Sequence, residues 1–116
     1  MAEEIIILFK ELAHFSSHQY VMLGLAVIVA YLIGCFSPAI AISKLNGIDI
    51  KKEGSGNAGT TNVLRVLGAK AALVTLITDI LKGCIAVKIG MDLCGFHGAA
   101  FAAFAVIMGH IFPIFY

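Results

Sequence analysis

YVMLGLAVIVAYLIGCFSPAIAIS, residues 20–43, decides the fold of this chain, because the whole stretch contains no charged side chain. About 20 apolar residues in a helix cross the hydrocarbon core of a bilayer. The stretch therefore predicts a membrane-spanning helix. Pro38 lies inside it and should kink the helix near its end, since proline lacks an N–H and clashes with the preceding turn.

Two further apolar stretches follow. AKAALVTLITDILKGCIAVKIG, residues 69–90, and GFHGAAFAAFAVIMGHIFPIFY, residues 95–116, predict a second and a third spanning helix. Residues 4–15 are apolar but too short to span, which favours a short interfacial or packed helix. The expected fold is all-α, a polytopic membrane helix bundle. It has three spanning helices and a short N-terminal apolar helix in a single membrane domain, residues 1–116.

The composition agrees with a membrane protein. Hydrophobic residues make up 60% of the chain and charged residues 13%, whereas a soluble domain carries roughly 25% charged residues. A net charge of +1, without a basic stripe beyond Lys51 and Lys52, gives no indication of nucleic-acid binding. The four histidines and three cysteines lack the spacing of metal ligands, so we expect no metal and no cofactor.

The distribution of basic residues predicts the orientation in the membrane. Loops rich in lysine and arginine stay in the cytoplasm. The turn at 88–94 holds only Lys88, whereas the segment after the first span holds Lys44, Lys51, Lys52, Arg65 and Lys70. We therefore expect a multi-pass protein of the cell (inner) membrane, with loop 44–68 cytoplasmic and the N-terminus external. The acidic pair Glu3 and Glu4 argues against a signal peptide.

Loop 44–68 carries the stretch GSGNAGTTNVLR, residues 54–65. Its glycines permit positive φ and let backbone N–H groups converge on a ligand. A helix beginning near Thr60 or Thr61 would point its positive end at the same place. Arg65 lies four residues after Thr61, on the same helix face, and its planar fork can grip two phosphate oxygens. The stretch therefore predicts an anion site. Its candidate phosphate-binding residues are Gly54, Gly56, Asn57, Gly59, Thr61 and Asn62, with Ser55 and Thr60 as further hydroxyl donors.

Two other interpretations explain parts of this stretch. A nucleotide-binding P-loop needs a lysine where Thr60 stands, and it needs a preceding strand where a membrane helix is expected. The required context is therefore missing. A flexible linker, capped by Thr60 or Thr61, explains the glycines. It does not explain the dense order of serine, asparagine, threonine and arginine, but on composition alone it stays open.

The stretch at 54–65 resembles the first signature of the bacterial acyl-phosphate-dependent glycerol-3-phosphate acyltransferases, the PlsY family. YLIGCFSPAIAISKLNGIDIKKEGSGN, residues 31–57, is similar to the first helix of that family and its entry to the loop. TDILKG at 78–83 and GHIFP at 109–113 resemble further family segments at suitable spacing. The resemblance covers nearly the whole chain after residue 20.

The resemblance implies a multi-span membrane enzyme of phospholipid synthesis. Such an enzyme transfers a fatty acyl group from acyl phosphate to the 1-hydroxyl of glycerol 3-phosphate, giving lysophosphatidic acid and phosphate without a metal. It also implies that Ser55 and Arg65 are catalytic, and that Thr61 and Asn62 belong to the phosphate-binding set. The family continues after GHIFP into a second phosphate loop and a third signature. The chain is therefore expected to be an N-terminal portion that is inactive alone and that associates with itself or with a missing C-terminal half.

Three polar residues lie within the expected spans: Asp79, Lys82 and His110. Lone charges in a bilayer are costly, so Asp79 and Lys82 should face the bundle and pair with each other or with a neighbour. A structural pair and a supporting role near the substrate are both open, as are a packed and an active-site role for His110. The alternative function is a small anion-binding transporter or channel subunit, in which Asp79 and Lys82 would line the path.

Overall fold

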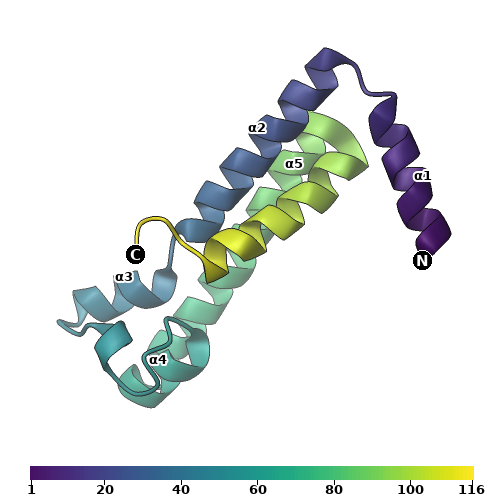
Figure 1. Ribbon diagram of the computed structural model, residues 1–116. Helices are drawn as coiled ribbons and strands as arrows, with labels where there is room; N and C mark the ends of the chain where they lie inside the picture. The colour runs from purple at the N-terminus through teal and green to yellow at the C-terminus, as the bar shows by residue number, and fades with distance from the viewer.

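The computed structural model describes residues 1–116, and every regular element in it is helical. This confirms the all-α expectation. The elements are α1 (Ala2–Ala13), α2 (Ser17–Cys35), α3 (Pro38–Leu45), the 3-10 turn η1 (Ile50–Lys52), α4 (Thr60–Leu67) and α5 (Ala69–Ile111). α3, η1 and α4 gather at one end of an elongated bundle formed by α2 and α5 (Figure 1).

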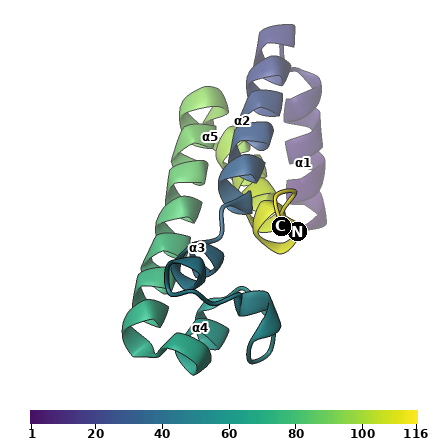
Figure 2. The ribbon, with the colours of Figure 1, turned by 90° about the vertical axis from the view of Figure 1, so that its left-hand side faces the viewer.

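α5 is a hairpin rather than one rod. Its backbone leaves helical geometry at Cys94 and Gly95, and the φ of +60° at Gly95 lies in the region that favours glycine. The chain reverses there, so that residues 69–93, the first arm, run antiparallel to residues 96–111, the second arm (Figure 2). The reversal falls between the second and third spans expected from the sequence.

α2 and α3 are separate helices where one kinked helix, 20–43, was expected. Phe36 and Ser37 are extended, and Pro38 occupies the first turn of α3. The Ser37 hydroxyl accepts a hydrogen bond of 3.3 Å from the Ile40 N–H and so caps α3. Proline restricts the preceding residue to extended geometry and suits the start of a helix. It therefore begins a new helix here instead of bending a continuous one.

Small residues let the three long segments approach closely. A methyl group added at Gly34 of α2 would lie 2.2 Å from the Val106 carbonyl oxygen of the second arm. One added at Gly98 would lie 2.0 Å from the carbonyl oxygen of Gly90, across the hairpin. Such close contact through small residues is typical of helix packing in membranes. The core between the segments consists of Ala30, Ala86, Ala102, Ala105 and Val106.

Large apolar side chains cover the outside of the bundle, as expected for a surface that meets lipid. Among the exposed ones are Val21, Leu25, Ile28, Leu73, Ile77, Phe104 and Ile107. Counted together, α2 and α3 (Ser17–Leu45) are the one helical stretch long and apolar enough to cross a membrane by length and composition. The first arm carries three charged residues in its middle and the second arm is short, so the number of spans stays a prediction.

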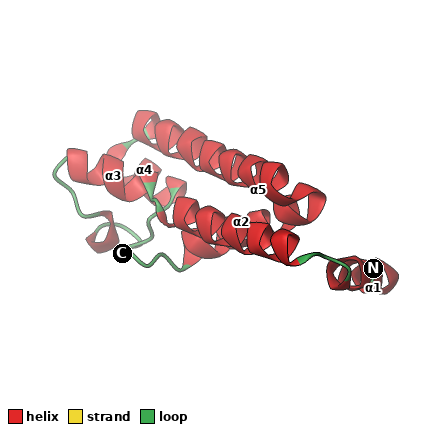
Figure 3. Cartoon of the chain, turned by 90° about the horizontal axis from the view of Figure 1, so that it is seen from above, coloured by secondary structure: helices red, strands yellow, loops and turns green.

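α1 projects beyond the bundle (Figure 3), and none of its residues is buried. Two contacts tie its end to the rest of the chain. The Tyr20 hydroxyl donates to the Leu12 carbonyl, and His97 Nε2 lies 2.9 Å from a carboxylate oxygen of Glu11. The short N-terminal helix expected from residues 4–15 is thus present and lies apart from the core.

Candidate functional site

The glycine-rich loop is a compact turn between η1 and α4. Gly54 and Gly56 have φ values of +53° and +75°, which side chains with a Cβ rarely adopt. At Gly54 a Cβ would also lie 2.2 Å from the Asn62 amide oxygen. The glycines are therefore needed for the backbone to turn tightly around the side chain of Asn62.

Asn62 organises this loop from within. Its side chain is 1% exposed, although it lies on the first turns of α4. Its amide nitrogen lies 3.0 Å from the carbonyl oxygens of Glu53 and Asn57, and 3.4 Å from that of Ile50. Its amide oxygen accepts a hydrogen bond of 3.0 Å from the Ser55 N–H. Every polar group of the side chain is thus bound to loop backbone. Asn62, expected in the phosphate-binding set, contacts the loop here rather than open space.

Ser55, Thr61 and Arg65 lie on the exposed side of the loop and of α4. The Ser55 hydroxyl accepts a hydrogen bond of 3.3 Å from the Asn57 N–H, which is the only bond it makes within the chain. Arg65 forms no ion pair with any carboxylate of the protein. The N-cap of α4 is Gly59, which has no side chain to bond the first N–H groups of the helix. Hydroxyl, guanidinium and backbone donors are therefore all unengaged on this side.

A cavity of about 530 Å³ lies between the loop, the end of α2 and the segment after α5. Lys51 brings a positive charge to it, and no aspartate or glutamate side chain lines it. The lining residues are Gly34, Cys35, Ser37, Ile40, Lys51, Gly56, Asn57, Ala58, His110, Ile111, Pro113 and Tyr116. A cationic side chain together with a side-chain amide suits an anionic group such as a phosphate, although the Gly56 N–H is already bound to the Glu53 carbonyl.

The structure brings only some of the expected site residues to this cavity. Gly56, Asn57 and His110 line it, whereas the other expected residues do not: Gly54, Ser55, Gly59, Thr61, Asn62, Arg65, Asp79 and Lys82. Sequence reasoning missed Lys51, Ser37 and Tyr116 as lining residues. The basic pair directly before the glycines was a usable signal for Lys51, and the Ser-Pro pair a weaker one for Ser37. No sequence signal indicates Tyr116.

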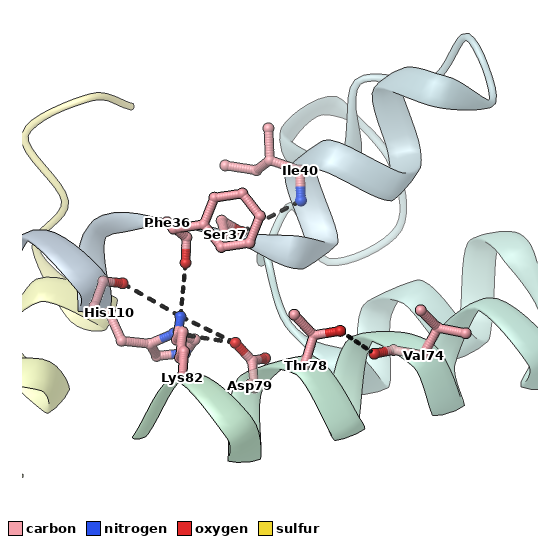
Figure 4. Close-up of polar contacts among 9 residues, drawn as sticks. Phe36, Ser37, Ile40, Val74, Thr78, Asp79, Lys82 and His110 are labelled. Carbon is pink, nitrogen blue, oxygen red and sulfur yellow. Dashed lines mark hydrogen bonds and ion pairs between the residues drawn. The ribbon is translucent and has the colours of Figure 1, made fainter. Parts of the chain in front are cut away.

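Next to the cavity lies a polar cluster centred on the buried Lys82 (Figure 4). The Lys82 ammonium is 3.0 Å from a carboxylate oxygen of Asp79, which confirms the expected pairing. It also donates to the carbonyls of Phe36 and Gly34, at 2.8 and 3.2 Å, and lies 2.9 Å from His110 Nδ1. The two carbonyls belong to the end of α2, where the helix leaves acceptors without an internal partner. Lys82 thus joins α2 to both arms of α5.

Comparisons with known proteins point to one family. The family model described as glycerol-3-phosphate acyltransferase matches residues 24–116. A glycerol-3-phosphate acyltransferase of Thermoanaerobacter sp. is 54% identical over 92 residues, which is 78% of this chain and 46% of that protein. One from Pseudomonas putida is 41% identical over 100 residues, covering 82% of this chain and 51% of its own.

A solved structure is similar as well. It is the crystal structure of PlsY, described as an integral membrane glycerol 3-phosphate acyltransferase, in its glycerol 3-phosphate form. The sequences are 38% identical and the TM-score is 0.74, with 81% of this chain and 48% of the other covered. The chain spans about half the length of the curated relatives it matches.

Proposed function

This chain belongs to the glycerol-3-phosphate acyltransferase family, and we propose that it supplies one substrate-phosphate site of a membrane enzyme that acylates glycerol 3-phosphate. The acyl donor in this proposal is acyl phosphate, and the products are lysophosphatidic acid and inorganic phosphate. The reaction feeds phospholipid synthesis.

One observation carries the proposal: the cavity that joins the glycine-rich loop to the apolar bundle. Lys51 offers a cation and Asn57 a side-chain amide, whereas the backbone N–H groups of Gly56 and Asn57 already donate within the loop. No aspartate or glutamate lines the wall. His110 and Ile111, which line the cavity, end the second arm of α5. Large apolar side chains cover the outside of both arms. A phosphate in the cavity would sit at the boundary between water and lipid, where an acyl chain in the bilayer meets a soluble phosphate ester.

The proposed step is direct acyl transfer. The 1-hydroxyl oxygen of glycerol 3-phosphate attacks the acyl carbonyl carbon, and a C–O bond forms. The bond between that carbon and the phosphate oxygen breaks, and the hydroxyl proton leaves with the departing phosphate. Loop 54–65 contains no histidine, aspartate or cysteine to act as a nucleophile. Ser55 and Arg65 do not line the cavity. In this proposal they bind and orient a phosphate on the exposed side of the loop, and proximity and charge stabilisation lower the barrier.

We further propose the membrane arrangement that this reaction requires. Residues 20–43, 69–90 and 95–116 span the bilayer, loop 44–68 faces the cytoplasm and the N-terminus lies outside. The position of the loop at one end of the bundle, with the reversal at Cys94 at the other, supports this arrangement. Association with a second copy or with a complementary segment would cover Asp79, whose side chain remains 20% exposed.

The test is acyl transfer by the full gene product in liposomes, with residues 1–116 assayed in parallel. We expect lysophosphatidic acid from acyl phosphate and glycerol 3-phosphate. Lys51→Met, which removes the charge that lines the cavity, should lower kcat/KM about 10–100-fold, the cost of one charge-assisted hydrogen bond. Lys52→Met is the matched control, because Lys52 is in the same turn and does not line the cavity. Phosphate flux without acyl transfer would instead support the transporter interpretation.

A further inference from the structure

We infer that Lys82 holds His110 as the neutral tautomer with its hydrogen on Nε2, and that this N–H donates to the phosphate-bearing substrate in the cavity. The inference rests on the proposed function only for the identity of the substrate. It makes His110 a substrate-binding donor and Lys82 the residue that positions it.

The hydrogens around Lys82 decide the tautomer. An ammonium has three N–H donors and no acceptor. Three of its neighbours, the carbonyls of Gly34 and Phe36 and the carboxylate of Asp79, only accept. His110 Nδ1 lies 2.9 Å from the same nitrogen, which has no lone pair, so Nδ1 also accepts and the four acceptors share the three hydrogens. A hydrogen on Nδ1 would point at a hydrogen of the ammonium. Nδ1 is therefore bare, and the ring hydrogen is on Nε2.

Other placements of the proton fit the cluster less well. A doubly protonated His110 would direct an N–H at the ammonium and create a second cation 2.9 Å from the first. A neutral Lys82 could accept from Nδ1, but it would then have only two hydrogens for two carbonyls and a carboxylate. Asp79, with its nearest oxygen 3.9 Å from Nδ1, balances the charge of Lys82.

The free nitrogen of His110 is available to a ligand. Nε2 makes no hydrogen bond within the chain, and the side chain keeps 42% of its surface exposed. His110 lines the cavity together with Gly56 and Asn57 of the loop. A neutral imidazole that presents Nε2–H is a donor, which suits an anionic oxygen. The cavity thus receives donors from both of its walls, the loop and the second arm of α5.

The tautomer is tested directly by nitrogen-15 NMR of the histidine rings in the full gene product, because bare and protonated ring nitrogens have well-separated shifts. His110 is assigned by comparison with the spectrum of His110→Gln, and the exposed His18 is the internal reference. We expect a bare Nδ1 and a protonated Nε2 at His110, with the Nε2 signal shifting as glycerol 3-phosphate is added. An Nδ1–H tautomer, an imidazolium, or an Nε2 signal unmoved at saturating glycerol 3-phosphate would overturn the inference.

Two substitutions separate donation to substrate from support of Lys82. His110→Gln keeps an amide N–H near the position of Nε2, whereas His110→Asn keeps an acceptor near Nδ1 and loses the outer donor. We expect kcat/KM to fall less than about 10-fold for the glutamine variant and about 10–100-fold for the asparagine variant, chiefly through KM for glycerol 3-phosphate. The opposite order would mean that His110 only satisfies Lys82.

The failure of this inference can be told apart from failure of the proposed function. If the protein binds glycerol 3-phosphate at His110 but transfers no acyl group, the donor assignment stands and the acyltransferase proposal falls. If acyl transfer proceeds while His110 carries its hydrogen on Nδ1, the acyltransferase proposal stands and the inference falls. Lys82→Met provides an additional check, since loss of the ammonium should let both tautomers of His110 appear.

Discussion

Replacing Asn62 with aspartate tests whether this side chain holds the glycine-rich loop in shape. The change keeps the size of the side chain and the oxygen that accepts from the Ser55 N–H. It replaces the amide NH₂ by a carboxylate oxygen that faces the carbonyls of Ile50, Glu53 and Asn57. Two N–H donors are therefore lost at a position that is 1% exposed.

The expected cost follows from these contacts. Two lost hydrogen bonds are worth roughly 1–3 kcal/mol. A buried carboxylate that faces three carbonyl oxygens adds to this, because burying a charge without donors is unfavourable. We therefore expect the free energy that keeps the loop closed to fall by at least about 2 kcal/mol. At about 1.4 kcal/mol for each factor of ten, the open form becomes about 30-fold more populated.

Trypsin cleavage after Lys51 and Lys52 measures that population, because both lysines lie in the turn that Asn62 fastens. When a segment closes faster than it is cut, the cleavage rate follows the population of the open form. The matched control is Asn46→Asp, since Asn46 is exposed and its amide donates only to the Ile42 carbonyl. We expect cleavage about 30-fold faster in Asn62→Asp and less than about fivefold faster in the control. Equal rates in the two variants would refute the assignment of Asn62 as the organiser of the loop.

Four further outcomes are expected. Arg65→Lys keeps the charge but loses the planar fork, and kcat/KM for acyl transfer should fall about 10–100-fold. Near-normal turnover would indicate that the loop is only a linker. Gly34→Ala places a methyl group 2.2 Å from a backbone oxygen and should lower stability in a detergent melt by about 1–3 kcal/mol. Gly24→Ala, in open space on the same helix, should be neutral or stabilising by up to about 1 kcal/mol. Cysteines placed at Lys52 and Asp92, in a background without the native cysteines, should be labelled from opposite sides of the membrane, and labelling from one side would contradict the three-span arrangement.

Much of the fold could be predicted because the apolar stretches are long and separated by polar or glycine-containing breaks. The hairpin of α5 illustrates this, since its reversal at Cys94 lies between the two apolar stretches expected from the sequence, 69–90 and 95–116. The break before Pro38 was expected only as a kink. Pro38 favours extended geometry before it, and Lys82, a residue of a distant segment, satisfies the carbonyls at the end of α2. Such a long-range hydrogen bond leaves no trace in local sequence pattern.

The sequence predicted which kinds of residue form the candidate site, but not what each residue contacts. The order of residues in 54–65 indicated an anion-binding loop, but Asn62 was counted among the ligand donors. Its actual partners are backbone carbonyls, which every residue carries and which therefore give no sequence signal. The opposite wall of the cavity could not be predicted from the sequence either. His110 and Lys51 line one cavity only because the second arm of α5 folds back along α2.

Asn62 and Lys82 do the same physical task at two places beside the cavity. Each is buried, and each directs its donors at backbone carbonyls that have left regular helix geometry. A buried amide or ammonium is costly unless its donors are satisfied, so each fixes the backbone that satisfies it. Ligand-binding groups on that backbone then need little reorganisation when a phosphate enters. Dipoles that are already in place stabilise charge best. On this reasoning, the loop and the end of α2 contribute rigidity. Lys51, Asn57 and His110 contribute the contacts in the cavity, and Ser55 and Arg65 those on the exposed side of the loop.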